Sequence, residues 1–223
     1  VGVDAPALSA PAALPKHATK FIGRRIELDS LLPRFTANPR LAITGDGGMG
    51  KTALSAALLE SYRATPAGQQ QTAHGLYAHN FYQQPSLESF LSGILAHAGQ
   101  ESKDPASDRT RVAALLRQPG ILLYLEGAKQ LPALEPVLDL IGQDTALLLT
   151  TRHSVPLHLL PSLPIGPLAE QDAIDLLHYH AANYPRRLGK NPWPHGLEDP
   201  GWSLLTRDLG RHPLAACRTC LQS

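Results

Sequence analysis

A glycine-rich run near residue 50 carries the clearest chemical pattern in the sequence. Residues 45–52 read Gly-Asp-Gly-Gly-Met-Gly-Lys-Thr, which satisfies the spacing GxxxxGK[ST]. In such a loop the glycines let consecutive backbone N–H groups turn toward phosphate oxygens, and the helix that follows adds the positive end of its dipole. Lys51 would reach the β- and γ-phosphates, and the Thr52 hydroxyl would bind Mg²⁺. The run therefore predicts a site for a nucleoside triphosphate and its metal ion.

The same glycines also fit a second phosphate-binding pattern. Gly45, Gly47 and Gly50 match GxGxxG, the fingerprint of dinucleotide-binding folds. That alternative needs an acidic residue at the end of the second strand to bind the ribose. His79 and Asn80 stand there instead, so we favour the triphosphate loop.

An acidic residue at the end of a hydrophobic strand would complete the metal site. Glu126 directly follows the apolar run 121–125, so we predict that Glu126 and Thr52 hold the Mg²⁺ shell. A strand-end glutamate that only faces solvent is the alternative. In many hydrolytic relatives of this loop a second acid follows and polarises the attacking water, whereas here Gly127 follows. We expect slow hydrolysis, on the order of 10⁻⁴ to 10⁻² per second, and faster turnover in Gly127→Asp if geometry permits.

The elements that must position these residues follow from the hydrophobic pattern. Strands are predicted at 41–44, 75–79, 121–125 and 146–150. Apolar runs that are continuous rather than alternating, separated by helices, indicate a parallel sheet covered on both faces. The predicted fold class is therefore α/β, a P-loop NTPase with a five-stranded parallel sheet flanked by helices and a small partial helical domain after it. The pattern places only those four strands.

Helical periodicity accounts for most of the remaining chain. The first helix is predicted to begin near Arg24 and to include Phe35, with Pro33 limiting its length. Further helices are predicted at 52–62, 86–95, 109–116, 134–141, 172–182, 202–209 and 213–221. We divide the chain into a Pro/Ala-rich linker (1–20), a P-loop NTPase domain (21–167) and a truncated helical bundle (168–223).

The composition excludes several classes of protein. The chain has 223 residues, a formal net charge of +1, 43% apolar residues and two cysteines. It can bury a real core, and no charge excess drives it onto nucleic acid or an anionic membrane. Its apolar runs are far shorter than the ~18 residues of a membrane span. We expect a cytoplasmic protein, and the missing initiating methionine suggests a fragment of a longer chain.

Four further segments carry a family likeness. In chain order, residues 21–28, 122–126, 148–152 and 210–215 resemble characteristic segments of the STAND-class P-loop ATPases. That family includes the NB-ARC and NOD-like regulators of cell death, plant immunity and bacterial defence. The likeness extends over nearly all of the chain outside its linker. Two departures stand out, namely Glu126-Gly127 in place of an acid followed by a polar residue, and Arg211-His212 where glycine or leucine is common.

The resemblance implies roles for individual residues. It implies that residues 21–24 lie over the adenine, that Arg152 senses the γ-phosphate and that Pro213 packs against the base. The predicted catalytic residues are Lys51, Glu126 and Arg152, and the predicted metal ligands are Thr52 and Glu126. The predicted nucleotide-binding residues are Phe21, Ile22, Gly23, Arg24, Gly45, Gly47, Gly48, Met49, Gly50, Lys51, Thr52, Ala53 and Pro213.

The function implied by the resemblance is a molecular switch. ATP or ADP with Mg²⁺ would set the state of a larger signalling protein, with weak ATPase activity and self-oligomerisation on activation. An effector would precede residue 1, and winged-helix and sensor domains would follow residue 223. We expect no direct nucleic-acid or membrane partner. The alternatives are a P-loop kinase or hydrolase acting on a small molecule, and an AAA-type ATPase.

Overall fold

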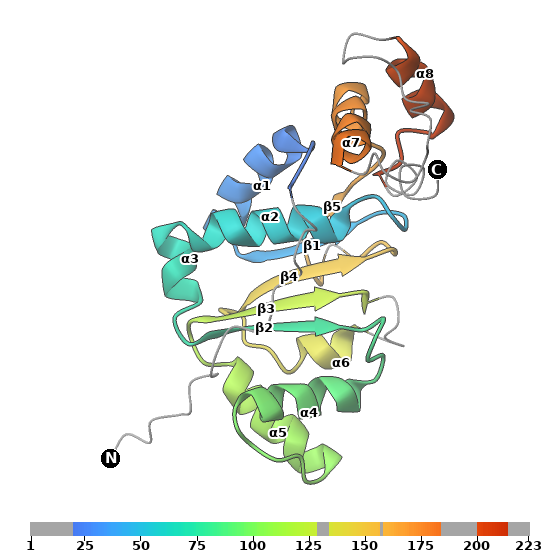
Figure 1. Ribbon diagram of the computed structural model, residues 1–223. Helices are drawn as coiled ribbons and strands as arrows, with labels where there is room; N and C mark the ends of the chain where they lie inside the picture. Colours follow the sequence, from blue (N-terminus) through green and yellow to red (C-terminus); the bar gives the residue numbers. More distant parts are fainter. Residues whose placement is uncertain (1–19, 129–133, 157, 184–199, 214–223) are drawn as a thin grey trace.

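The computed structural model describes residues 20–128, 134–156, 158–183 and 200–213 (Figure 1). The predicted linker 1–20 lies outside this part except for Lys20. Of the predicted helix 213–221 only Pro213 is described, and most of the chain between the predicted helices 172–182 and 202–209 also falls outside. Among the described residues, no helix combines the length and apolar character that a bilayer crossing requires.

A five-stranded parallel sheet forms the centre of the fold, as predicted. Its strands are β1 (Arg40–Thr44), β2 (Gly75–Asn80), β3 (Ile121–Glu126), β4 (Ala146–Thr151) and β5 (Ser162–Pro164). They lie in the order β2-β3-β4-β1-β5, and every pairing is parallel. All strands therefore end at the same edge of the sheet, which is where ligands bind in open α/β sheets.

Helices cover both faces of this sheet (Figure 1). The helices of the described residues are α1 (Arg25–Ala37), α2 (Lys51–Arg63), α3 (Pro66–Gln71), α4 (Leu87–His97), α5 (Pro105–Leu116), α6 (Glu135–Leu138), α7 (Glu170–Asn183) and α8 (Gly201–Asp208), of which α7 and α8 do not cover the sheet. Successive side chains of β3 alternate between the two faces of the sheet. Leu122 and Tyr124 join the apolar cluster under α1 and α2, whereas Leu123 and Leu125 join the cluster that includes α4 and α5. Burial on both faces explains why the strand is apolar throughout.

Two predicted boundaries change in the structure. Pro33 was expected to limit the first helix, but it lies inside α1, which continues to Ala37. Leu31 and Phe35 are both buried there, and we attribute the continuation to this packing, which offsets the missing N–H of proline. The predicted helix at 134–141 shortens to Glu135–Leu138.

Two elements carry little apolar pattern and were not located in the sequence. β5 has three residues, none of them buried, so it lacks the apolar run of the other strands. α3 is rich in glutamine and has only Gly68 buried. Its start does carry a capping pattern, because the Thr65 hydroxyl accepts a hydrogen bond from the Gly68 N–H and Pro66 opens the first turn.

A small helical part follows β5. α7 and α8 pack against each other through Ile174, Leu177 and Trp202, which form an apolar cluster separate from those of the sheet. Figure 1 shows these two helices beyond the edge at which the strand arrows end. The helical part thus stands beside the edge where a phosphate loop would hold its ligand.

Candidate functional site

The glycine-rich run forms a loop between β1 and α2, the context that a phosphate loop requires. Gly50 precedes the first helical residue and has φ +84°, a left-handed backbone that glycine adopts without strain. Gly45 has φ +146°, and a side-chain carbon there would lie 2.4 Å from the Ile165 carbonyl oxygen. The loop therefore depends on glycine both for its turns and for its close approach to neighbouring backbone.

Lys51 is buried at the first turn of α2 and folds back over the loop. Its Nζ donates hydrogen bonds to the carbonyl oxygens of Gly45, at 2.8 Å, and Asp46, at 2.7 Å. Burial lowers the pKa of Lys51, and the positive charge of Arg152 lowers it further. A phosphate oxygen would be a stronger, charged acceptor for this ammonium than either carbonyl.

Glu126 lies against the loop at the end of β3. One carboxylate oxygen accepts a hydrogen bond from the Thr52 hydroxyl, and the other accepts one from Asn80 Nδ2 at 3.1 Å. The contact with Thr52 argues against a glutamate that only faces solvent. A hydroxyl and a carboxylate offer the hard oxygen ligands that Mg²⁺ prefers, and one or two such groups beside substrate phosphates are its usual protein shell. Thr52 and Glu126 therefore fit the predicted metal.

Strand register explains why Asn80 and Thr150 join this site. Asn80 pairs with Glu126 across β2 and β3, and Glu126 pairs with Thr150 across β3 and β4. Neither residue was included in the predicted site. The position of Asn80 at the end of the second strand was visible in the sequence, but its partner depends on the order of strands in the sheet. Asn80 holds the Glu126 carboxylate toward Thr52.

Arg152 lies at the loop, as the resemblance implies. A side-chain carbon on Gly47 would lie 3.0 Å from the Arg152 guanidinium carbon. The guanidinium carbon of Arg152 is also 5.6 Å from the centre of the Tyr82 ring, a cation–π distance. Arg152 and Lys51 thus place two positive charges beside the loop, where the charge of a terminal phosphate would lie.

A cavity of about 440 Å³ opens on these residues. All of the predicted site residues line it except Gly23, Gly45 and Met49. The sequence did not suggest several others, which come mainly from the helical part and the chain before it: Lys20, Tyr82, Thr150, Leu168, Leu176, Tyr179 and His180. A volume of this size suits a small-molecule ligand.

The helical part contacts the loop directly. A ring nitrogen of His212 lies 2.9 Å from the Gly47 carbonyl oxygen. Leu168 N–H donates to the Arg211 carbonyl at 3.0 Å, and Pro213 lies 4.0 Å from the place of a side-chain carbon on Gly50. The segment around Pro213 therefore closes over the cavity.

A second, more polar cavity lies beside the first. It has a volume of about 290 Å³, and its lining includes Asn80, Gln83, Gln84 and Tyr124. Glu126 lines both cavities. Among the described residues, no group of three or more histidine, cysteine, aspartate or glutamate side chains is arranged to hold a metal ion by itself.

Comparison with known proteins shows the fold. No family model and no curated protein matches the sequence. The structure of PCH-2 from C. elegans is similar, with a TM-score of 0.59 and 12% identity over 89% of this chain and 62% of that one. The RuvB Holliday junction branch migration motor of Thermotoga maritima gives a TM-score of 0.52 and 16% identity, over 93% of this chain and 63% of that one. The chain thus spans less than two thirds of either.

These similarities and the sheet order confirm the α/β P-loop NTPase fold. At 12% and 16% identity these similarities establish the fold but not the function of the chain. The resemblance to STAND ATPases, the residue roles that it implies and the domain boundaries all remain predictions.

Proposed function

We propose that this chain binds ATP and ADP with Mg²⁺ and serves as the nucleotide-operated switch of a STAND-type signalling protein. Residues 21–167 form the P-loop NTPase domain, and residues 168–223 belong to a helical domain that closes over the nucleotide. The nucleotide state then governs self-assembly and the output of an effector. Hydrolysis is slow and resets the switch.

One observation carries this proposal. A single cavity joins the loop residues Lys51 and Thr52 to the apolar residues Ile22, Leu176 and Pro213. The first pair suits phosphates, and the second group suits the flat apolar surface of a base. Because Leu176 and Pro213 belong to the helical part, the nucleotide would be held between both parts of the chain. A ligand held in this way dissociates slowly, which suits a switch better than a rapid catalyst.

A second candidate is an AAA-type ATPase, which the fold suits equally well. The similar solved structures include RuvB, which is described as a branch migration motor. Both candidates share the loop, the metal ligands and the parallel sheet. They differ in their partners: a motor on nucleic acid relies on basic surface to bind phosphates, and the formal net charge of +1 offers no overall excess. Stimulation of ATP hydrolysis by DNA would favour the motor.

Retention of ADP during purification tests the proposal. The nucleotide is enclosed by the loop and by the segment around Pro213, so ADP should remain bound through desalting. The measurement is heat denaturation of the desalted protein followed by anion-exchange chromatography of the supernatant. ADP close to one equivalent per chain is expected. A supernatant without adenine nucleotide, from protein that also fails to bind added ADP, would contradict the proposal.

Replacing Glu126 with glutamine should uncouple nucleotide binding from Mg²⁺. Glutamine keeps the shape of the side chain and can still bond to Thr52, but it loses the charge that attracts the metal. The expected loss of Mg²⁺ affinity is about 10- to 100-fold, with ADP affinity in EDTA within about threefold of wild type. Titrations of ATP at graded Mg²⁺ concentrations measure both.

Asp46→Asn provides the matched control for this variant. Asp46 is an exposed acid of the same loop, so its substitution removes a charge of the same sign. Its Mg²⁺ dependence should match wild type. Equal Mg²⁺ affinities in Glu126→Gln and wild type would show that Glu126 is not a metal ligand.

A further inference from the structure

We infer that Arg24 and Asp172 form a joint through which the docking of α7 sets the shape of the phosphate loop. The joint has two separate links. The guanidinium of Arg24 bonds to the loop, and the backbone N–H of the same residue bonds to Asp172 on α7. The inference rests on the proposed nucleotide binding and names a regulatory contact of that site.

The two terminal nitrogens of Arg24 bond to protein groups, whereas its buried Nε has no hydrogen-bond partner. Arg24 is 3% exposed, and one terminal nitrogen donates to the Met49 carbonyl oxygen at 2.9 Å and to the Gly166 carbonyl oxygen. The other terminal nitrogen donates to Glu27 Oε1 at 2.8 Å. Gly166 lies in the chain between β5 and α7. Arg24 thus ties the loop to the segment that leads into the helical part.

The bond to Met49 bears on how the loop holds phosphate. The peptide between Met49 and Gly50 is trans, because none of the described peptide bonds is cis. The C=O and N–H of a trans peptide point in opposite directions. By holding the Met49 carbonyl, Arg24 directs the Gly50 N–H the other way, and Gly50 lines the cavity. Arg24 is therefore a positioning residue for a phosphate-binding amide.

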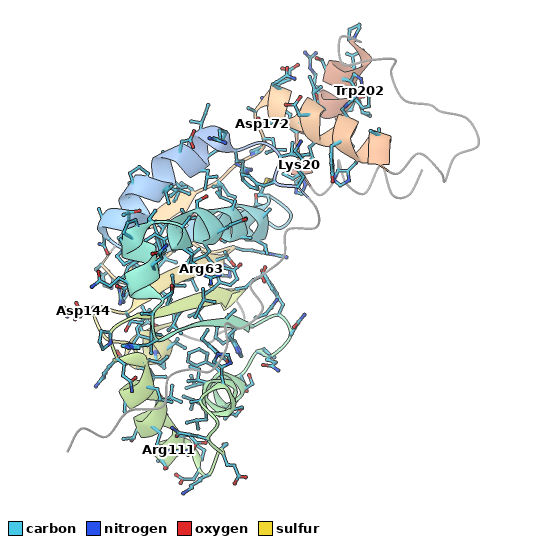
Figure 2. The ribbon with its side chains drawn as sticks, turned by 60° about the vertical axis from the view of Figure 1, so that its left-hand side comes forward. Lys20, Arg63, Arg111, Asp144, Asp172 and Trp202 are labelled. Carbon is cyan, nitrogen blue, oxygen red and sulfur yellow. The ribbon has the colours of Figure 1, made fainter. Side chains whose placement is uncertain are left out.

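Asp172 supplies the second link. It belongs to the first turn of α7, and its Oδ2 accepts the Arg24 N–H at 2.8 Å. The contact is close: a side-chain carbon on Gly23 would lie 2.8 Å from Asp172 Cβ. Figure 2 shows Asp172 at the end of α7 that faces the rest of the chain. The bond also holds Arg24 in a left-handed backbone with φ 55° and ψ 29°, which is uncommon outside glycine.

The joint couples the two ends of the cavity. α7 contributes Leu176, Tyr179 and His180 to the lining, whereas Asp172 is not part of it. When α7 is docked, Asp172 and Gly166 both hold Arg24, and Arg24 holds the Met49 carbonyl. When α7 moves away, Arg24 loses the bond to Asp172, and the Gly50 amide loses the part of its orientation that this bond supports. The state of the helical part is thereby transmitted to the phosphate site.

Substitutions that remove the two sets of hydrogen bonds separately test the joint. Arg24→Gln removes the guanidinium bonds but keeps the backbone N–H for Asp172, and Asp172→Ala removes only the link to α7. Each variant should weaken ADP binding about tenfold, the effect of one charge-assisted hydrogen bond. AMP, which lacks the β-phosphate, should be weakened less than twofold. The double variant should lose little more than either single variant, because both cuts break one chain of contacts.

Two further variants serve as controls. Asp172→Asn keeps an oxygen that can accept the Arg24 N–H, so it should restore ADP binding to within about threefold of wild type. Asp175→Ala removes another acid of α7, one that bonds to Gln171 on the exposed surface, and should have no effect. Isothermal titration with ADP and AMP gives all the affinities, and thermal melting confirms folding.

The outcomes separate the joint from the proposed function. If wild type binds no ADP, the proposed function fails. If wild type binds ADP but Asp172→Ala matches Asp175→Ala, the joint is wrong. Equal losses of ADP and AMP affinity would mean that Asp172 only fastens α7 and does not act on the phosphate loop. Additive losses in the double variant would mean that the two links act independently.

Discussion

Lys51→Ala should abolish the retention of ADP, with affinity for ADP and ATP falling roughly 10²- to 10³-fold. Truncating one partner of a buried charge pair costs about 2 to 5 kcal/mol, much of it from leaving the other charge unpaired. Lys51 is buried beside the loop, and its ammonium donates hydrogen bonds to two carbonyl oxygens of the loop. Its ammonium therefore needs little rearrangement to meet a phosphate.

The loss must be separated from unfolding of the loop. Lys51 bonds to the carbonyls of Gly45 and Asp46, so alanine also removes two hydrogen bonds, at about 1 kcal/mol each. Thermal melting in the absence of nucleotide measures that part. Titration with ADP at a temperature well below both melting transitions then reports binding alone.

Lys103→Ala is the matched control for the charge. Lys103 is exposed, so its removal changes the net charge equally without touching the cavity, and it should leave ADP affinity unchanged. Wild-type affinity in Lys51→Ala would mean that the loop does not bind phosphate through this lysine. The assignment of the cavity to a nucleotide would then lose its basis.

The phosphate loop and the four apolar strands could be predicted because their determinants are local. Glycine spacing fixes the loop, and a strand buried on both faces is apolar along its whole length. Glu126 could be placed for the same reason, since it directly follows such a strand. Its contact with Asn80 depends on β2 lying next to β3, and the pattern of a single strand does not encode its neighbour.

The remaining site residues depend on contacts between distant parts of the chain. Arg24 and Asp172 are 148 positions apart, and no periodicity links them. The resemblance implied that the segment 21–24 lies over the base. The structure shows Arg24 at the cavity, where its terminal nitrogens donate to Met49, Gly166 and Glu27 and its buried Nε has no hydrogen-bond partner. The site residues that come together only when α7 packs against the rest of the chain therefore could not be predicted from local sequence patterns.

Gly127→Asp should destabilise the protein and should not accelerate hydrolysis, contrary to the expectation from sequence. Gly127 has φ +74°, and a side-chain carbon there would lie 2.6 Å from two carbons of the Tyr82 ring. The sequence pattern predicted a second acid as possible at this position, but in the structure the exposed Tyr82 ring occupies the space that its side chain would need. The left-handed backbone costs about 1 to 2 kcal/mol, and the Tyr82 ring, which is 42% exposed, can turn outward at a smaller cost. The expected fall in melting temperature is roughly 2 to 8 °C.

The clash has a consequence for Arg152 as well. An aspartate at 127 would push the Tyr82 ring aside, and that ring lies 5.6 Å from the Arg152 guanidinium carbon. The added carboxylate would also attract Arg152 away from a terminal phosphate. Both effects act against faster phosphate release. The expected single-turnover rate of Gly127→Asp is therefore equal to or below that of wild type, which we place on the order of 10⁻⁴ to 10⁻² per second.

A double-variant cycle with Tyr82→Ala isolates the clash. If the ring causes the destabilisation, Tyr82→Ala/Gly127→Asp should recover much of the free energy of unfolding lost in Gly127→Asp, and the strain of the left-handed backbone should remain. The unfolding free energies come from denaturant titration, and the rates come from single-turnover release of labelled phosphate. A stable Gly127→Asp variant with faster release would show that Tyr82 yields and that an acid at 127 can orient the water. A wild-type rate above about 1 per second would instead mean that a base already lies elsewhere in the chain, because Glu126, if it holds the proposed Mg²⁺ together with Thr52, is not free to orient the water as well.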